Sequence, residues 1–224
     1  MARDNSPKIR NKRQLERKRT SRASYDRILI VSEGSKTEPN YFKEIRSAYR
    51  LQTANIEVRA SELGTAPFQV VEYAKALFEN GDSHKRIQKR AFEHVFTIFD
   101  RDDHDSYSQA LSLANSLNGR LKNDNNQLIT FTAISSIPCF ELWLLLHYED
   151  IKSPLHRKEV IQRLKKHLPT YEKGTSNAFA NTKQHLELAI SRAQMLADKF
   201  TAYTSPEPFT NIHVLVRRLT TLGK

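Results

Sequence analysis

The chain has 224 residues, a formal net charge of +11 at pH 7 and one cysteine. The length fits one domain with room for an extension, and a single cysteine excludes a disulfide framework and a zinc site built on several thiolates. No apolar run approaches the ~20 residues that span a bilayer, and no signal-peptide pattern is present, so we expect a cytoplasmic protein without membrane contact. The positive charge favours a polyanionic partner, nucleic acid first.

The charge is concentrated in residues 1–24. This segment holds nine lysines and arginines against two acids, a formal charge of +7 that leaves +4 for the rest of the chain. It has too few apolar residues to pack a face, so we expect a flexible basic arm. The arm can bind phosphate backbones without reading sequence, or it can act as a solubilising tail or a docking segment. The side chains predicted to bind nucleic acid are Lys12, Arg13, Arg17, Lys18, Arg19 and Arg22.

Residues 25–150 alternate short apolar runs with helical patterns. We expect strands at 28–31, 55–60, 95–99 and 128–134. We expect helices with an N-cap at Thr37, from Pro67 to Asn80, at 106–118 and at 139–148. Strands that alternate with helices predict an α/β fold, with a small, roughly four-stranded parallel sheet flanked by crossover helices.

The chain changes character after Pro154, where the strand patterns stop. Helical patterns follow at 156–167, 181–200 and 211–222. We therefore predict three parts: a basic N-terminal arm over 1–24, an α/β domain over 25–150, and a helical C-terminal part over 151–224 that packs on the same domain.

Acidic residues follow two of the predicted strands. Glu33 comes just after the first strand, and Asp100, Asp102 and Asp103 lie at and after the third. Because ligands of open parallel sheets bind beyond the carboxyl ends of the strands, we expect these acids to share one edge. Clustered carboxylates repel one another unless a cation compensates them, and Mg²⁺ or Mn²⁺ suits oxygen ligands. The alternative is that Asp-Arg-Asp-Asp is only a polar turn.

Three other features have competing interpretations. His104 follows the acids and can assist proton transfer or be a solvated turn residue, while His213 fits the apolar rhythm of the last helix and is either functional or a packing histidine. Cys139 is expected to be a core thiol. Residues 34–37 resemble a P-loop superficially, but the required glycine spacing is missing, so we expect no nucleotide hydrolysis by this chain.

Four segments, in order, resemble the RloB-like family. Residues 32–42 (Ser-Glu-Gly-Ser-Lys-Thr-Glu-Pro-Asn-Tyr-Phe) are similar to its first motif, and 99–104 (Phe-Asp-Arg-Asp-Asp-His) to its second. Residues 138–144 (Pro-Cys-Phe-Glu-Leu-Trp-Leu) are similar to the third, and 211–219 to the terminal helix. The resemblance covers about residues 25–220. Ser32 stands where cysteine is common and Ile137 where asparagine is common, and neither departure removes a carboxylate.

The resemblance implies a TOPRIM fold and an activity. In such sites one glutamate and an Asp-x-Asp hold Mg²⁺ for phosphodiester chemistry, which corresponds to Glu33, Asp100 and Asp102. Nucleases of this type add further acids, for which Asp103 and Glu141 are the candidates. The resemblance also implies a role in bacterial anti-phage defence, often beside a separate ATPase.

This yields a hypothesis about the site. Glu33 would be a metal ligand or a general base, and Lys36 would offset charge on the reacting phosphate. Glu141 lies in an apolar helix, where a buried carboxylate needs a metal or a lysine partner. Glu38 is an accessory candidate, although acids are favoured at helix starts in any case.

Two functions remain in competition. The first is a Mg²⁺-dependent nuclease that acts on DNA or RNA. The second is a non-catalytic or partner-regulated subunit that binds nucleic acid or the ATPase. The sequence leaves open whether the chain forms a homo-oligomer.

Overall fold

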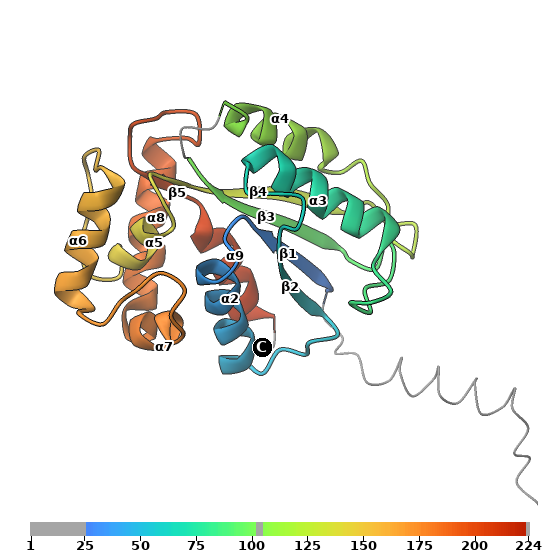
Figure 1. Ribbon diagram of the computed structural model, residues 1–224, viewed down its shortest axis with the longest axis horizontal. Helices are drawn as coiled ribbons and strands as arrows, with labels where there is room; N and C mark the ends of the chain where they lie inside the picture. The colour runs from blue at the N-terminus through green and yellow to red at the C-terminus, as the bar shows by residue number, and fades with distance from the viewer. Residues whose placement is uncertain (1–25, 102–104, 223–224) are drawn as a thin grey trace, which may run out of the picture.

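The computed structural model describes residues 26–101 and 105–222, and it is an α/β structure with a five-stranded sheet (Figure 1). Four strands are parallel: β1 (Ile28–Ser32), β2 (Ile56–Ala60), β3 (His94–Asp100) and β4 (Thr130–Ile137). The fifth, β5 (Phe209–Thr210), pairs antiparallel with β4, and the order is β2-β1-β3-β4-β5. The predicted α/β class with a mostly parallel sheet is thus confirmed.

Helices cover both faces of the sheet. On one face lie α3 (Pro67–Asn80) and α4 (Tyr107–Leu117), and on the other lie α2 (Thr37–Ala48) and α9 (Ile212–Thr221) (Figure 1). Alternate residues of β1 supply the two cores: Ile28 and Ile30 pack on the α2 side, and Leu29 and Val31 on the α3 side. Both faces are apolar because crossover helices bury each of them.

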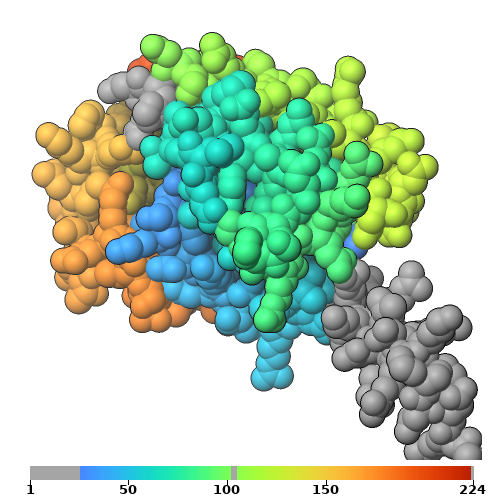
Figure 2. All heavy atoms as spheres, turned by 45° about the vertical axis from the view of Figure 1, so that its right-hand side comes forward, coloured from blue at the N-terminus to red at the C-terminus, as the bar shows by residue number. Residues whose placement is uncertain are grey.

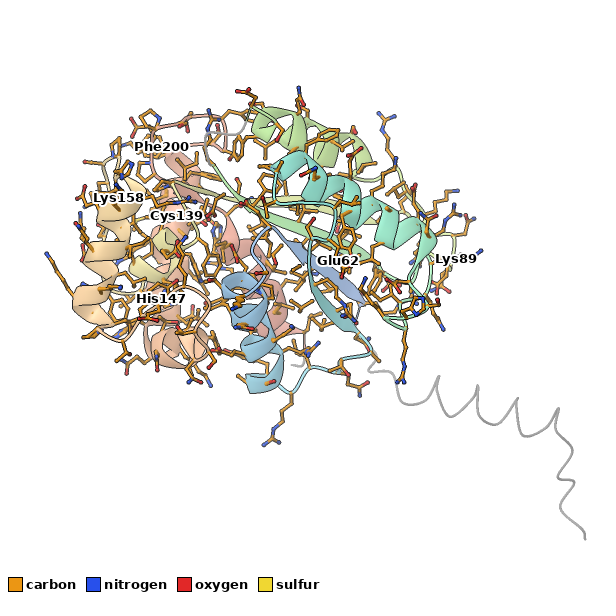
Figure 3. All side chains as sticks on the ribbon, in the orientation of Figure 1. Glu62, Lys89, Cys139, His147, Lys158 and Phe200 are labelled. Atoms are coloured by element: carbon orange, nitrogen blue, oxygen red, sulfur yellow. The ribbon has the colours of Figure 1, made fainter. Side chains whose placement is uncertain are left out.

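The remaining helices gather at one end of the molecule (Figure 1). They are α5 (Glu141–Leu145), α6 (Arg157–His167), α7 (Ala178–Thr182), the 3₁₀ turn η1 (Lys183–His185) and α8 (Leu186–Lys199). Their apolar side chains, among them the buried Trp143, join the same core as α2 and α9. The buried Cys139 belongs to this core as well (Figure 3). Burial raises the pKa of the Cys139 thiol, so it behaves as the expected core residue.

Two helix predictions were wrong in extent. The predicted helix 139–148 is α-helical only over Glu141–Leu145, because residues on both sides close tighter turns, such as Tyr148 N–H to Leu145 O. The predicted helix 181–200 is divided into α7, η1 and α8. The early start of α7 has a tertiary cause: Glu44 of α2 accepts hydrogen bonds from the backbone amides of Asn177, Phe179 and Ala180.

Two further details differ from expectation. The prediction that no strand follows Pro154 was wrong, since β5 pairs with β4. The hydroxyls of Ser136 in β4 and Thr210 in β5 lie 3.0 Å apart. The sequence did not reveal β5, because two residues are too few to show the alternation of apolar and polar side chains that marks a strand. Thr37 is not an N-cap but the first residue of α2, and its hydroxyl accepts a hydrogen bond from the distant Gly174 N–H instead.

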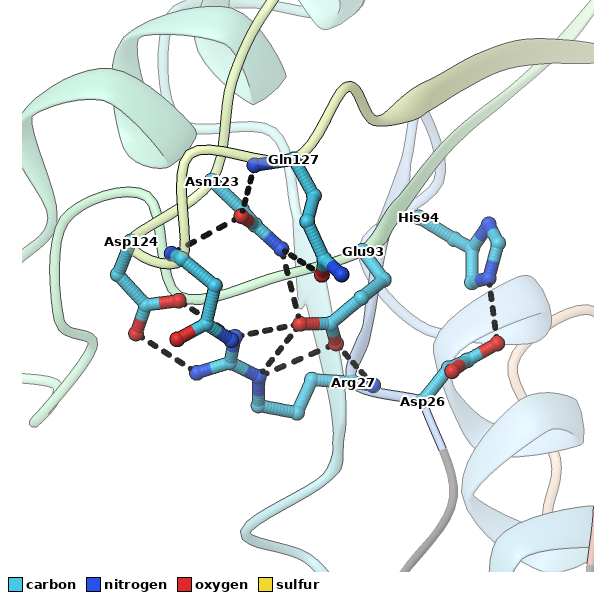
Figure 4. Close-up of polar contacts among 8 residues, drawn as sticks. Asp26, Arg27, Glu93, His94, Asn123, Asp124 and Gln127 are labelled. Carbon is cyan, nitrogen blue, oxygen red and sulfur yellow. Dashed lines mark hydrogen bonds and ion pairs between the residues drawn. The ribbon is translucent and has the colours of Figure 1, made fainter.

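An arginine network ties down the amino ends of the strands. Arg27, just before β1, donates to Glu93 before β3 and to Asp124 before β4, with contacts of 2.5 and 2.6 Å (Figure 4). Asn123 also donates to Glu93. The network joins the starts of three parallel strands that are distant in sequence.

None of the helices within 26–101 and 105–222 is long and apolar enough to cross a membrane.

Candidate functional site

A pocket of about 290 Å³ opens at the carboxyl ends of β1 and β3. Four acids line it, and we call it the acidic pocket: Glu33, Glu38, Asp100 and Glu141. They come from three places in the chain: the loop after β1 with the first turn of α2, the end of β3, and the start of α5. The position agrees with the ligand crevice of open parallel sheets.

Glu33 and Asp100 are held together by the register of the sheet. The backbone N–H of Glu33 donates to Ile98 O in β3, and the backbone N–H of Asp100 donates to Oε2 of Glu33 at 3.1 Å. Parallel pairing of β1 with β3 therefore sets this contact. The sequence prediction that the two acids share one edge is confirmed.

Glu38 is buried in the pocket, with 7% of its surface exposed. A glycine makes this possible: a Cβ on Gly34 would lie 2.0 Å from Oε2 of Glu38. Any side chain at position 34 would therefore displace the carboxylate. The helix dipole favours an acid at the start of a helix, but it does not explain why the Glu38 side chain is buried inside the pocket.

Glu141 is the most deeply buried of the four acids. Its Oε1 accepts a hydrogen bond of 3.1 Å from the Tyr171 hydroxyl and lies 3.5 Å from Nζ of Lys173. Its Oε2 is buried and has no hydrogen-bond partner among the described residues. The expectation that this carboxylate needs a metal or a lysine partner is met by Lys173 at one oxygen.

Basic side chains surround the acids. Arg157, at the start of α6, donates to Oδ2 of Asp100 at 3.1 Å. Lys36 lines the pocket and packs on Gly174, where a Cβ would approach 2.9 Å from the Cβ of Lys36. Gly174 has φ +83°, which also favours glycine. Figure 2 shows the same junction on the surface, with the blue α2 region beside the orange chain that follows α6.

Burial and neighbouring acids raise the pKa values of two acids of the pocket, Glu38 and Asp100. Burial, reinforced by the charges of Glu141 and Glu33, raises the pKa of Glu38 to about 7. Burial raises the pKa of Asp100 well above its usual range, and the charges of the other three acids add to this while Arg157 opposes it. Burial and Glu141 likewise raise the pKa of Tyr171. Burial and neighbouring negative charge thus oppose the ionisation of Glu38 and Asp100.

The side-chain atoms that face the pocket are of the kind that binds a hard divalent cation. They include carboxylate oxygens, one of which has no hydrogen-bond partner among the described residues, in a pocket where positive charge would relieve repulsion. Within the described parts of the chain, however, no three acid, histidine or cysteine side chains are already arranged to hold a metal ion. Two of the acids are instead paired with Arg157 and Lys173.

Several predicted site residues lie outside the described parts of the chain. These are the second and third aspartates and the histidine of the second motif, and the basic arm: Asp102, Asp103, His104, Lys12, Arg13, Arg17, Lys18, Arg19 and Arg22. His213 is buried in α9 among core residues and does not line the pocket. Its surroundings are those of a packing histidine.

Sequence reasoning missed three residues that contact the acids of the pocket. Tyr171 and Lys173 lie in the loop after α6, and Arg157 begins α6. No motif or periodicity marks them in the sequence. They were undetectable because each contacts an acid 30 or more residues away in the chain.

Comparison with protein families identifies a match over nearly the whole described chain. The model of the RloB-like proteins matches residues 28–219. This span contains all four acids of the pocket and the basic residues around them. Neither the curated proteins nor the solved structures include a significant match.

Proposed function

Because the chain belongs to the RloB-like protein family, we propose that it is a TOPRIM-type, Mg²⁺- or Mn²⁺-dependent nuclease that acts in bacterial anti-phage defence. The observation that carries this proposal is the convergence of four carboxylates from three separate segments in one pocket, with a buried Glu141 oxygen that accepts no hydrogen bond from the described residues. Structural acids in proteins are normally paired. An excess of acids in a cleft favours a cation-dependent site.

The residues divide into two roles. Glu33, Asp100 and Glu141, with Asp102 and Asp103, would hold the metal, and Glu33 alternatively acts as the general base. A bound divalent cation would polarise the scissile phosphate and lower the pKa of the attacking water. Lys36 and Lys173 line the pocket and would offset charge on the phosphate. Arg157 orients Asp100 through their ion pair.

The proposed substrate is DNA or RNA, bound in part by the basic arm of residues 1–24. The arm would supply affinity without sequence preference, and its binding would weaken steeply with salt. A separate ATPase is the proposed partner because the family resemblance implies one, and the chain itself lacks P-loop spacing. Co-purification of the chain with the product of a neighbouring ATPase gene tests this part.

The direct test of catalysis is cleavage of plasmid DNA and of total cellular RNA by the purified chain in Mn²⁺ or Mg²⁺. We expect cleavage that EDTA abolishes and that Asp100→Asn and Glu141→Gln reduce at least a thousandfold, since each removes a carboxylate from the pocket. The matched control is Glu72→Gln, which changes an exposed acid on α3 in the same way and should cleave like wild type. Cleavage that survives Asp100→Asn would refute the proposal.

The role in defence is tested in cells. Bacteria that express the wild-type chain with its neighbouring genes should resist phage, and those with Asp100→Asn should not. Equal phage plating on both strains would separate the nuclease from the proposed defence function.

One observation favours a second candidate, a partner-regulated subunit. Arg157 and Lys173 pair with Asp100 and Glu141, and no three potential ligands of the described chain are already grouped. A partner could release these pairs and complete the site. If the purified chain is inert and cleaves only when the ATPase is added, this candidate is correct.

A further inference from the structure

A second cavity adjoins the acidic pocket and carries the opposite charge. It has a volume of about 580 Å³, and we call it the basic cleft after its side chains Arg101, His156, Arg157 and Lys158. The lining residues that the structure describes include no acid. Lys158 lies in the first turn of α6 (Figure 3) and is exposed.

The two cavities share a wall. Arg157 lines both, and it contacts Asp100 of the acidic pocket at 3.1 Å. Arg101 follows Asp100 directly and lies over the ring of Tyr107, 4.8 Å from its centroid. The basic cleft is therefore within reach of the nucleotides next to a phosphate that a nucleic-acid strand placed in the acidic pocket.

The rest of the cleft is apolar. Its lining includes Pro138, Pro154, Leu155 and Pro206, of which Pro154 and Pro206 are exposed. Cations beside an apolar surface suit a ligand that has both phosphate groups and flat, weakly polar faces. The volume lies in the range of pockets that enclose small organic ligands.

We propose that the basic cleft binds the unpaired nucleotides that flank the scissile phosphate, so that the substrate is a single strand or an unpaired loop. This inference rests on the proposed nuclease function. Arg101, Lys158 and His156 would contact phosphates, and the prolines and Leu155 would contact a base. A duplex offers only phosphates and groove edges, because its base faces are stacked inside, and it would leave the apolar lining unused.

The test uses two substitutions that reverse charge without weakening α6. The Nδ1 of His156 caps the helix by accepting from Lys158 N–H at 3.2 Å, and His156→Asp keeps an acceptor at this N-cap. Lys158→Glu places an acid in the first helical turn, where the dipole favours it. The double variant should therefore unfold at the wild-type temperature or above. Lys166→Glu, an exposed change on the same helix outside the cleft, is the control.

Binding is measured on the full chain in EDTA by fluorescence anisotropy, so that no cleavage occurs. The probes are a six-nucleotide thymidine strand, its uridine counterpart, a duplex, and a six-unit abasic strand. We expect the double variant to bind the normal single strands about tenfold more weakly, with a shallower salt slope by about 0.7 for each lost contact. Lys166→Glu should change binding less than twofold. The basic arm is present in every variant, so its contribution cancels.

Three results would overturn the inference: an equal loss in Lys166→Glu, an equal loss for duplex and single strand, or wild-type binding of the abasic strand as tight as that of the thymidine strand. The thymidine and uridine probes decide between DNA and RNA as the source of the strand.

Failure of the nuclease proposal would look different. Hydrolysis of the small diester bis(p-nitrophenyl) phosphate by wild type needs the acidic pocket but not the cleft. Absent hydrolysis in wild type with intact strand binding would refute catalysis and leave the cleft assignment standing.

Discussion

Two groups of acids lie at opposite ends of the same sheet and differ in what balances them. At the amino ends of the strands, Glu93 and Asp124 flank the Arg27 guanidinium, which contacts both (Figure 4). At the carboxyl ends, the four acids of the acidic pocket crowd together, and the pKa of Glu38 rises to about 7. We call the first end matched, because one guanidinium contacts both of its acids, and the second unmatched, because burial and neighbouring acids raise the pKa values of Glu38 and Asp100.

The difference separates structure from function in physical terms. A buried acid with a bidentate arginine stabilises the fold or is neutral to it, and removing its partner is costly. Acids that raise one another's pKa values destabilise the folded state at neutral pH, and proteins retain such clusters at functional sites. The following predictions test whether the two ends differ in this way.

The largest expected effect is at the matched end. Arg27→Met keeps the apolar stem but leaves Glu93 and Asp124 without their guanidinium, so we expect the free energy of unfolding to fall by about 3 kcal/mol. Urea denaturation measures it. Adding Glu93→Gln in the Arg27→Met background should recover part of the loss, because one uncompensated charge is removed. A loss below about 0.5 kcal/mol would show that the network does not stabilise the fold.

At the unmatched end we expect a substitution to raise the free energy of unfolding rather than lower it. The folded pKa of Glu38, about 7, lies above its ordinary value of 4.5. Its contribution to stability is therefore fully present below pH 4.5 and is lost as the pH rises through 7. Glu38→Gln removes this loss, so the variant should be more stable than wild type by about 2 kcal/mol at pH 8.

The control for the Glu38→Gln prediction is the same stability measurement at lower pH. In EDTA, the difference between Glu38→Gln and wild type should shrink toward zero at pH 4.5, where both side chains are neutral. Denaturant midpoints measured from pH 4.5 to pH 8 give this profile. A variant less stable than wild type at pH 8 would contradict the assignment of Glu38 to an unmatched cluster.

A divalent cation should stabilise the folded protein by binding at the unmatched end and not at the matched end. If the dissociation constant is near 1 mM, 10 mM MgCl₂ should raise the free energy of unfolding of wild type by about 1.4 kcal/mol. Asp100→Asn should lose most of this gain, and Glu72→Gln should keep it. Urea denaturation against KCl of equal ionic strength makes the comparison, and an equal gain in all three proteins would point to non-specific salt effects.

The smallest predicted effect concerns the glycine beneath Glu38. Gly34→Ala forces the Glu38 carboxylate to move, since the added Cβ would lie 2.0 Å from its Oε2, and should cost about 1 kcal/mol. In a Glu38→Ala background the same substitution should cost almost nothing. A double-mutant cycle from denaturation midpoints measures the coupling, and additive effects would show that the close approach is unimportant.

Much of the sheet and part of the pocket were predictable from the sequence. The four parallel strands follow from apolar runs that alternate with helical patterns, and α3 runs from Pro67 to Asn80 as its boundary residues predict. The meeting of Glu33 with Asp100 also follows, because parallel strands bring their carboxyl ends to one edge. These features depend on local pattern and on one rule of topology.

Only the tertiary structure decided the rest. The burial of Glu38 depends on the missing side chain of Gly34, and the environment of Glu141 depends on Tyr171 and Lys173 from a loop without any motif. The start of α7 likewise depends on Glu44 of a distant helix. The physical reason is common to all three. Periodicity reports which face of an element is buried, whereas partners of a buried charge are chosen by packing between segments far apart in the chain.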